Sequence, residues 1–413
     1  MIRRIVILND LAEPKGGATA LALLSAHRFL QRGHPVTFIT GDSGDNAQLR
    51  EDGAEIVALG QNRLLSGSTL AAMRVGLYNG AAYRMVADWI RANDTPGTVY
   101  HLHGWAQILS PSIFRALQQV LDRVVLSAHD FFLACPNGSY SLLKTGEVCT
   151  LSPMSLRCIA TNCDRRNYVH KLWRVTRQAI QRYFYNRRTS PPILAIHEAM
   201  RPFLMRAGIP SSAIRTLPNP VTAWTQTRIV AEENRDILFV GRLEETKGAD
   251  LAAQACKMAG AKLRCIGDGV LRAALSRNPA VQLEGRQNAA GIAAIAAQAR
   301  LLVMPSRYPE PYGLVAAEAA WSGLPVIAPP TAFLTGDLVA AGAGMAVEPR
   351  DTANFAATLR RIIDDDALCA QMSHAAFSGT RAIALDPDAW IDRLLDTYSE
   401  RLSISSAAEL HAS

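Results

Sequence analysis

The sequence predicts an α/β protein of two domains, each built around a parallel β-sheet. Short apolar runs alternate along the chain with stretches of helical character, as expected for strands that are joined by crossover helices. One such run, Ile237 to Val240, is apolar at every position, which is typical of a strand buried on both faces of a parallel sheet. With 413 residues, 49% of them hydrophobic and 19% charged, the chain is long enough to bury two cores of ordinary size.

We assign residues 1–220 to the first domain. Its first strand is expected over about residues 3–9, and the helix that follows, from about Thr19 to Gln31, ends before Gly33. Four further strands are expected in this domain, at residues 35–40, 98–102, 123–128 and 193–196. The order of strand and helix predicts a Rossmann-like arrangement.

Prolines and polar residues mark the domain boundary. The segment Leu217-Pro-Asn-Pro-Val221 has two prolines around an asparagine, which suits a rigid crossing segment and a hinge at Pro218 to Pro220. We therefore assign residues 221–385 to the second domain. Residues 386–413 are predicted to form a helix that packs back on the first domain, followed by a flexible tail.

Two glycine turns follow predicted strands in the second domain. The first strand ends at Gly241, and two cations, Arg242 and Lys247, follow in the loop. A guanidinium grips two oxygens at once while an ammonium acts as a point charge, so the pair forms a plausible diphosphate clamp. The second turn, with Gly267 and Gly269, ends the next strand and is weak evidence by itself.

The most informative stretch is Glu310-Pro-Tyr-Gly-Leu-Val-Ala-Ala-Glu318. It follows a predicted buried strand, so Glu310 lies in a loop and Glu318 lies in the helix that starts after Gly313. A helix start is a ready anion site, and each carboxylate accepts hydrogen bonds from sugar hydroxyls. The pattern predicts a sugar-nucleotide pocket that also includes the residues at the helix start: Tyr312, Gly313, Leu314 and Val315.

Histidines follow two strands of the first domain. His101 and His103 lie in or after one strand, and His129 and Asp130 follow another. Open α/β sheets bind ligands at the carboxyl ends of their strands, so a site is expected there, although a lone histidine is more often structural. The paired glycines at 16–17 either make a plain tight turn or let the backbone approach a ligand.

Together these motifs resemble the retaining glycosyltransferases of family 4, the glycosyl transferases group 1, which have the GT-B fold. The matching residues are Val-Gly-Arg-Leu…Lys-Gly at 240–248, Gly-Asp-Gly at 267–269, the two glutamates at 310 and 318, and Trp321-Ser-Gly-Leu-Pro-Val-Ile-Ala328. The resemblance implies two Rossmann-like domains whose sheets face an interdomain cleft. It also implies transfer of a sugar from a nucleotide sugar with retention of configuration.

The resemblance carries residue roles with it. Arg242 and Lys247 would stabilise the leaving diphosphate, Glu310 would hold sugar hydroxyls, and Glu318 would hold the ribose. His129 would orient the reacting groups, while His101, His103 and Asp130 are acceptor-side candidates. The backbone around the donor would come from five glycines: Gly16, Gly17, Gly241, Gly267 and Gly269. Neither a cofactor nor a catalytic metal is implied.

The chain departs from the family pattern in three places. Pro329 to Gly336 replaces a Gly-Gly-Pro-Glu-like segment beside the donor pocket, which puts the sugar and the base in doubt. His197 stands where serine is usual, and the aspartate that often follows the crossing segment is missing after Val221. These two changes bear mainly on packing.

Four of the seven cysteines fall in one turn-rich insertion at about residues 131–165: Cys135, Cys149, Cys158 and Cys163. Four thiols can hold a structural zinc ion in a tetrahedron, but no Cys-x2-Cys pair is present. Unligated thiols and a redox role therefore stay open beside the zinc interpretation.

Residues 165–188 contain eight Lys or Arg and no acid. If this segment forms a helix, one face of the helix is apolar, and Lys171, Arg174 and Arg177 lie toward the opposite face. The segment is either a packed helix with a solvated basic face or a peripheral membrane contact. The second interpretation and the net charge of +7 suit a lipid-linked acceptor, and no nucleic-acid-binding motif accompanies the charge. No signal peptide or membrane-spanning run is recognised, so a cytoplasmic protein is expected, and the membrane interpretation of residues 165–188 would place it at the inner face of the membrane.

The function expected from these patterns is transfer of a sugar to a glycan or lipid-linked glycan, in the biosynthesis of surface polysaccharide or glycoconjugates. A sugar-nucleotide epimerase or phosphorylase of the same fold is an alternative, as is a non-catalytic GT-B-like protein that binds a glycan or nucleotide. The sequence selects neither UDP nor GDP, and it fixes neither the acceptor, the linkage nor the oligomeric state.

Overall fold

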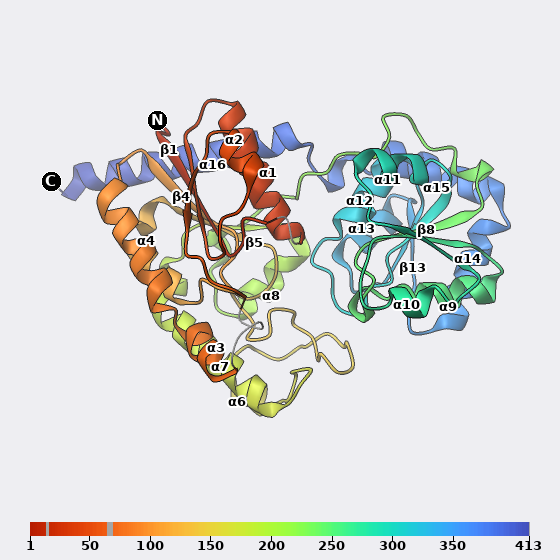
Figure 1. The fold of residues 1–413 in the computed structure, drawn as a ribbon, viewed down its shortest axis with the longest axis horizontal. Helices are drawn as coiled ribbons and strands as arrows, with labels where there is room; N and C mark the ends of the chain where they lie inside the picture. Colours follow the sequence, from red (N-terminus) through yellow and green to blue (C-terminus); the bar gives the residue numbers. More distant parts are fainter. Residues whose placement is uncertain (14–15, 64–68, 413) are drawn as a thin grey trace. The chain divides into compact units, whose positions relative to one another are not determined.

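A computed structural model of the protein describes residues 1–13, 16–63 and 69–412. The chain divides into two compact units (Figure 1). Unit 1 comprises residues 1–145, 149–217 and 388–413, and unit 2 comprises residues 146–148 and 218–387. Each unit is built on its own parallel sheet with helices around it, which confirms the predicted α/β class.

In the described part of unit 1, seven parallel strands pair in the order β3-β2-β1-β4-β5-β6-β7. Their bounds are β1 Arg4–Asn9, β2 Val36–Thr40, β3 Glu55–Ala58, β4 Thr98–Leu102, β5 Val124–Ala128, β6 Ile193–Ala195 and β7 Ile214–Thr216. The helices are α1 Gly17–Gln31, α2 Ala47–Glu51, α3 Thr69–Leu77, α4 Gly80–Asn93, α5 Ser112–Leu117, α6 Leu156–Ala160, α7 Tyr168–Phe184 and α8 Arg201–Arg206. The central strands β1, β4 and β5 are buried, so their carboxyl ends are rigidly placed.

The described residues of unit 2 form a six-stranded parallel sheet in the order β10-β9-β8-β11-β12-β13. Its strands are β8 Asp236–Val240, β9 Leu263–Ile266, β10 Val281–Gly285, β11 Ala299–Val303, β12 Val326–Ala328 and β13 Gly344–Ala346. The helices are α9 Ala249–Ala259, α10 Arg272–Leu275, α11 Ala289–Ala296, α12 Leu314–Trp321, α13 Phe333–Ala340, α14 Thr352–Ile363 and α15 Asp366–Gly379. The neighbouring strands β9, β8 and β11 carry the predicted donor loops at their carboxyl ends.

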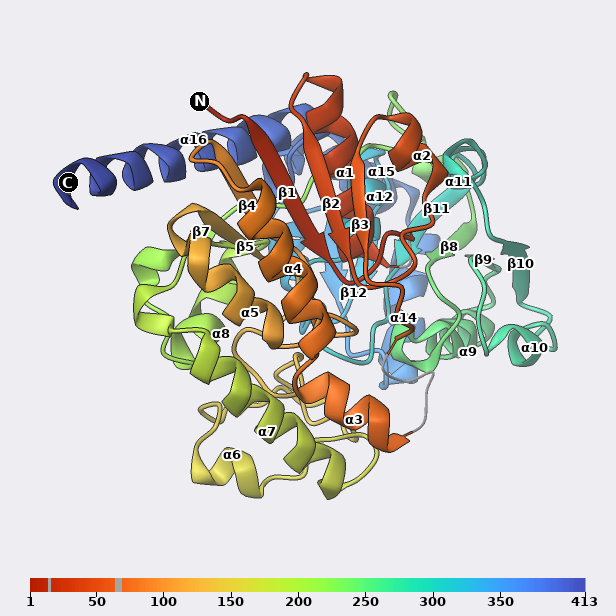
Figure 2. The same cartoon turned by 60° about the vertical axis from the view of Figure 1, so that its left-hand side comes forward.

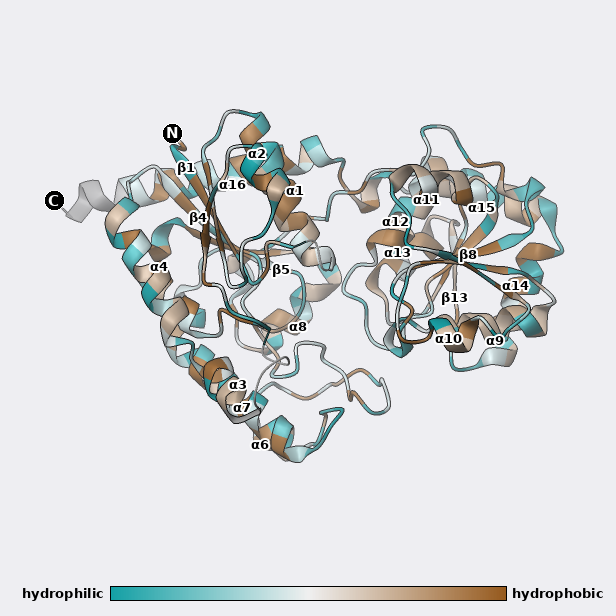
Figure 3. Cartoon of the chain, in the orientation of Figure 1, coloured by the Kyte–Doolittle hydropathy of each residue, from teal (hydrophilic) through white to brown (hydrophobic). Residues whose placement is uncertain are grey.

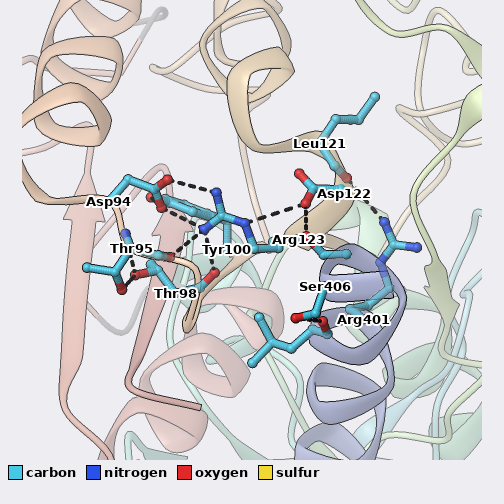
Figure 4. Close-up of polar contacts among 11 residues, drawn as sticks. Asp94, Thr95, Thr98, Tyr100, Leu121, Asp122, Arg123, Arg401 and Ser406 are labelled. Carbon is cyan, nitrogen blue, oxygen red and sulfur yellow. Dashed lines mark hydrogen bonds and ion pairs between the residues drawn. The ribbon is translucent and has the colours of Figure 1, made fainter. Parts of the chain in front are cut away.

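The helix α16, Pro387–Ala412, belongs to unit 1 almost entirely. The Tyr398 ring packs against Phe29 of α1 with centroids 5.6 Å apart, and Arg401 donates to the carbonyl of Leu121 at 3.3 Å. The same region has a bidentate pair between Arg123 and Asp94, with both N–O distances 2.7 Å (Figure 4). The contacts of Tyr398 and Arg401 tie the helix to α1 and to the segment that precedes β5.

The segment between β5 and α7, residues 129–167, contains only one short helix, α6, although all of it is described. A long irregular segment leaves backbone carbonyls without sheet or helix partners, and these must find other donors when they are buried. Side chains of α7 supply several: Gln181 donates to the carbonyl of Phe132 at 2.9 Å, and Gln178 donates to that of Leu133 at 3.3 Å.

This packing corrects the expectation of an α7 with a solvated basic face. Lys171, Arg177, Gln178 and Gln181 are buried, while apolar residues of the predicted inner face, Leu172 and Tyr183 among them, are exposed. Brown, apolar segments alternate with teal, polar ones around α3, α6 and α7 in Figure 3, and Figure 2 views the same helices from another side. In the described part of the chain, no helix is long and apolar enough to cross a membrane.

Candidate functional site

The predicted donor residues of unit 2 lie in loops at the carboxyl ends of β8, β9 and β11 and in the helix α12, which follows the last of these loops. The loops after β8 and β9 approach very closely, because a Cβ on Gly267, which has a φ of 136°, would lie 1.9 Å from the carbonyl oxygen of Gly241. Glycine is therefore required at position 267. Leu243 donates its backbone N–H to the carbonyl of Asp268 at 2.9 Å, which fixes the turn that holds Gly269.

Lys247 and Glu310 meet although they lie on different loops. The Nζ of Lys247 donates to Oε2 of Glu310 at 2.6 Å, and the Ser306 hydroxyl reaches the same oxygen at 3.2 Å. Both charged side chains are partly exposed, at 33% and 23%. A carboxylate and an ammonium in contact with each other and with solvent can bind polar ligand groups of either charge.

Arg242 is more open than its predicted partner. Its side chain is 65% exposed and donates to Glu244 at 2.8 Å. No contact between Arg242 and Lys247 is observed, so the two cations of the predicted clamp are not held to each other. A long, exposed guanidinium has several rotamers from which to reach an anion.

The helix α12 starts as predicted. Gly313 is its N-cap in the left-handed conformation, and Leu314 and Val315 form its first turn, where backbone N–H groups lack intrahelical partners. Glu318 lies one turn further and accepts a bond from Trp224 Nε1 at 3.3 Å. Burial raises the pKa of Glu318 to about 7, and the indole bond offsets only part of this rise.

Tyr312 is placed differently from the other donor residues. Its side chain is buried, and its hydroxyl donates to the carbonyls of Ile383 at 2.8 Å and Asn219 at 3.3 Å. The tyrosine therefore holds the segments that enter and leave unit 2. Trp224 and Ser306 were not predicted as site residues. The sequence gives no sign that Trp224 contacts Glu318, 94 positions away, or that Ser306 contacts Glu310, 4 positions away.

Unit 1 has a cavity of about 130 Å³ at the carboxyl ends of β1, β4 and β5. The predicted residues His103, His129 and Asp130 line it, together with Asn9 and Asp10 at the end of β1. Two residues at the start of α1, Ala18 and Thr19, also lie on its wall, and α1 begins at Gly17 with Gly16 as its N-cap.

The two cavity histidines are linked to each other and are neutral. His103 Nδ1 lies 3.0 Å from His129 Nε2, so one ring donates and the other accepts. Burial lowers the pKa of His129 to about 4 and that of His103 well below its ordinary value. The two remaining nitrogens, His103 Nε2 and His129 Nδ1, are buried without a hydrogen-bond partner. Buried polar atoms usually have a partner, so these nitrogens are free to bind a ligand group.

A carboxyl group completes this cavity. Burial raises the pKa of Asp130 to about 6, against the opposing effects of the Phe132 N–H bond and the charge of Arg177. Arg177 is itself buried, and burial lowers its pKa to about 10. Asp10 accepts three backbone N–H groups, from residues 107 to 109, at 2.7 to 2.8 Å, which orders the loop after β4.

His101 lies behind the cavity rather than on its wall. It is fully buried, with Nδ1 2.6 Å from the Tyr398 hydroxyl and Nε2 2.9 Å from Ser127 Oγ. Its ring lies tilted against that of His103, with centroids 4.0 Å apart. His101 therefore positions its neighbours, and Tyr398 of α16 positions His101.

Asp10 and Arg177 could have been found from the sequence only in part. Asp10 comes directly after β1, so the strand-end argument that located His129 applies to it as well. Arg177 gives no such signal, because its helix has a basic face that normally indicates solvent exposure.

Two family models match adjacent parts of the chain. The model described as Glycosyltransferase Family 4 matches residues 15–223, and the model described as Glycosyl transferases group 1 matches residues 222–378. The two matches together include His103, His129 and Asp130 of the histidine cavity and all of the donor loops in unit 2.

Relatives and solved structures agree with these matches. Glycogen synthase from Mycobacterium tuberculosis is 31% identical over 153 residues, which are 34% of this chain and 37% of that protein. An uncharacterized 42.6 kDa protein from the cps region of Klebsiella pneumoniae is 22% identical, over 78% of this chain and 84% of the relative. The crystal structure of HepE from Anabaena in complex with UDP superposes with a TM-score of 0.67 at 16% identity, over 96% of this chain and 100% of HepE.

Proposed function

Because the chain belongs to the glycosyltransferases of family 4, the glycosyl transferases group 1, and has the GT-B fold, we propose that it transfers a hexose with retention of configuration from a nucleotide sugar to a glycan or lipid-linked glycan. The single observation that carries this proposal is the meeting of Lys247 with Glu310 close to the start of α12 and Glu318. Charged groups of both signs are needed there to bind a diphosphate and a sugar together.

We place the nucleotide sugar on unit 2. Lys247 would move from Glu310 to the diphosphate, and the freed carboxylate would accept hydroxyl hydrogen bonds from the sugar. Arg242, exposed and on the adjacent loop, would add a second cation to the leaving group. Preorganised charge of this kind is commonly the largest contribution to catalysis. Glu318, as a carboxylate, would accept the ribose hydroxyls. These roles for unit 2 rest on the described geometry and on the family.

The reaction itself is a simple exchange at the anomeric carbon. The bond between this carbon and the leaving diphosphate oxygen breaks, and a bond to an acceptor hydroxyl oxygen forms on the same face. The hydroxyl proton passes to the leaving diphosphate. We assign orientation of the reacting groups to His129, whose Nδ1 is buried and unpaired. The neutral imidazole would accept or donate a hydrogen bond without adding charge.

We place acceptor recognition on unit 1. The histidine cavity of about 130 Å³ has room for part of a sugar. A second, polar hollow of about 290 Å³, lined by Asp42, Gln61 and Asn62 among others, lies beyond the ends of β1 and β2. Amides and carboxylates of this kind suit a hydroxyl-rich glycan. Because HepE is similar in fold and was crystallised with UDP, a uridine nucleotide is the first donor to test.

We also propose a peripheral membrane contact through α6 and α7. Exposed apolar side chains form what we call the α6–α7 face: Leu156, Tyr168, Val169, Leu172 and Tyr183. Tyr168 joins the two helices by donating to the Ile159 carbonyl at 3.0 Å. The exposed Arg157 and Arg166 lie in the same region of the sequence. Aromatic and aliphatic groups beside arginines fit the interface of an anionic bilayer, where a lipid-linked acceptor would be found.

The donor site is tested by thermal unfolding with UDP, GDP, ADP and their common sugars. A ligand at about 100 times its dissociation constant stabilises the fold by roughly 2.7 kcal/mol. We expect one nucleotide to raise the unfolding temperature of the wild type and to have little effect on Glu318→Ala. If no nucleotide shifts either protein, the donor site is wrong and a glycan-binding protein without catalysis becomes the better hypothesis. Interconversion of the free sugar nucleotide would instead indicate an epimerase.

A further inference from the structure

Four thiols of unit 1 line one small cavity in the irregular segment before α7. They belong to Cys135, Cys149, Cys158 and Cys163, and the cavity has a volume of about 10 Å³, which is about the space of one water molecule. Cys149 is partly exposed and the other three are buried. The site is separate from the histidine cavity and has no place in the proposed sugar transfer.

A buried lysine lies among these sulfurs. Lys171 of α7 is 1% exposed, and its Nζ lies 3.4 Å from the Sγ of Cys163 and 3.6 Å from that of Cys158. Cys163 Sγ also accepts a hydrogen bond from Asn137 Nδ2 at 3.4 Å. In the described part of the chain, no carboxylate pairs with the Lys171 ammonium, so sulfur takes the place of the usual counter-ion.

This arrangement is unusual for a buried lysine, which is almost always paired with an acid. Burial alone lowers the pKa of Lys171, but the Cys163 and Cys158 sulfurs outweigh burial and raise that pKa above its ordinary value. The ammonium in turn stabilises a neighbouring thiolate electrostatically, and the thiolate is the reactive form of cysteine.

The geometry of these cysteines differs from that of a zinc site. Among the described residues, no three His, Cys, Asp or Glu side chains are placed to hold a metal ion. The cation beside the two sulfurs is the lysine ammonium.

We propose that Lys171 and Cys163 form an oxidant-sensitive covalent cross-link, in which one oxygen atom bridges the lysine nitrogen and the cysteine sulfur. Hydrogen peroxide is a small, uncharged oxidant. Contact between nitrogen and sulfur leaves room for a single bridging atom, and Cys163 is the nearer of the two sulfurs. The link would join the first turn of α7 to the segment that precedes the helix.

The step balances with two molecules of hydrogen peroxide as the oxidant. The first oxidises the Cys163 thiolate to a sulfenic acid and is reduced to water, while the Lys171 ammonium supplies the proton and becomes the amine. The second, with the sulfenic acid and the lysine amine, gives S–O–N and two further waters. Sulfur and nitrogen each lose two electrons, the S–O and O–N bonds form, and two hydrogens are lost for one oxygen gained. A thiol reductant reverses the link by returning those four electrons.

The experiment treats the purified full chain with hydrogen peroxide and maps its peptides by mass spectrometry. We expect a peptide containing Lys171 joined to one containing Cys163, with a mass about 14 Da above their sum, that disappears after treatment with a thiol reductant. Lys171→Arg keeps the positive charge and should give no link, and neither should Cys163→Ser. Cys265→Ser, which removes a buried thiol from β9 of unit 2, should leave the link intact.

Three results would overturn the proposal. The first is a Cys158–Cys163 disulfide, seen as a loss of about 2 Da without a lysine link. The second is an unchanged mass for both peptides at peroxide levels that oxidise exposed methionines. The third is one zinc ion per untreated chain that is lost in Cys163→Ser. Wild-type mapping decides among these outcomes even if Lys171→Arg folds poorly, which thermal unfolding of that variant would reveal.

Discussion

At the scale of single residues, burial sets the charge state of Glu318 near neutral pH. Its pKa is raised to about 7 because the carboxylate loses water, and the Trp224 bond compensates only in part. A ribose hydroxyl that donates to this oxygen would favour the ionised form. Donor binding and proton release from Glu318 are therefore expected to be coupled.

The first prediction concerns the pH dependence of donor affinity. Below pH 7 the free protein holds a proton on Glu318 that must leave on binding, so affinity for a nucleotide sugar should fall by about tenfold per pH unit. Above pH 7 the affinity should level off. Titration calorimetry from pH 5.5 to pH 8.5 measures this, with Glu318→Gln as the control for other titrating groups. Equal slopes in both proteins would mean that Glu318 does not bind the donor as a carboxylate.

The second prediction concerns Lys247. Its contact with Glu310 at 2.6 Å places it where it would stabilise a leaving diphosphate, so Lys247→Ala should lower kcat by roughly 100-fold to 1,000-fold. The matched control is Lys257→Ala, which removes an exposed lysine from the last turn of α9. A change confined to KM would contradict a role in the transition state, because it would mean that ground state and transition state are bound equally.

Several site residues were within reach of the sequence and others were not. Lys247 and Glu310 follow strands of the unit 2 sheet, and parallel strands bring their carboxyl ends to one edge, so the closeness of these two residues follows from local pattern. By the same argument His129 was expected at the corresponding edge of the unit 1 sheet. Trp224 and Arg177 depend on packing between segments far apart in the chain. No local pattern encodes the meeting of Trp224 with Glu318.

At the scale of elements, α7 shows why amphipathic pattern alone can mislead. A helix normally buries its apolar face. Here the neighbouring irregular segment and α3 present unpaired carbonyls, and Arg177 donates to that of Gly76 at 2.9 Å. Satisfying those carbonyls requires polar side chains on the inner side. The apolar side is left on the surface.

The third prediction is that this exposed side binds anionic bilayers. Replacing Leu156 and Tyr183, which are 87% and 81% exposed, by serine should weaken binding to vesicles of anionic lipid while leaving the unfolding temperature nearly unchanged. Co-sedimentation with vesicles measures the loss. The matched control is Val270→Ser, because Val270 is 84% exposed and lies in unit 2. Equal binding by all three proteins would remove the membrane from the proposed function.

The fourth prediction concerns the ion pair of Arg123 and Asp94. The Arg123 side chain is 9% exposed and makes two 2.7 Å bonds to the carboxylate, so Arg123→Ala leaves a partly buried charge without its partner. We expect a loss of about 3 kcal/mol in the free energy of unfolding. Denaturant titration measures it.

The control for this pair is Arg91→Ala. Arg91 contacts Asp88 at 2.8 Å, but both side chains are more than 60% exposed. Such surface pairs contribute about 1 kcal/mol or less. Similar losses in the two variants would show that burial of the Arg123 pair is unimportant.

Most elements were predictable and the exceptions have physical reasons. The predicted strands at 98–102 and 193–196 agree with β4 and β6 within a residue. β3 and β7 were missed because both are short: β3 is an incompletely buried edge strand of four residues, and β7 is only Ile214–Thr216. The burial of polar side chains and exposure of apolar ones on α7 could not be predicted, because both depend on backbone carbonyls of other segments.

At the scale of the whole molecule, the two units differ in how the chain forms them. Apart from residues 146–148, unit 2 is one continuous stretch, residues 218–387. Unit 1 needs residues 388–413 in addition to its earlier segments. The core of unit 2 is therefore formed almost entirely by one continuous segment, whereas the core of unit 1 needs segments from both ends of the chain.

The fifth prediction follows from this difference. A fragment of residues 218–387 should unfold cooperatively and be stabilised by the same nucleotide as the full chain. A chain that lacks residues 388–413 should lose stability in unit 1, because Phe29 and His101 lose their contacts with Tyr398. Calorimetry of both proteins measures these effects. An unstable fragment, or a shortened chain as stable as the original, would contradict this division of the core.

The return of α16 to unit 1 also sets an order of events during protein synthesis. The ribosome releases the sheet of unit 1 first, then makes all of unit 2, and only afterwards delivers Tyr398 to His101. At typical elongation rates this interval lasts on the order of ten seconds. During that time the surface of unit 1 that α16 will contact is exposed. Nascent chains are therefore expected to depend on chaperones in that window, and a prematurely ended translation product would hold an incompletely supported histidine cavity.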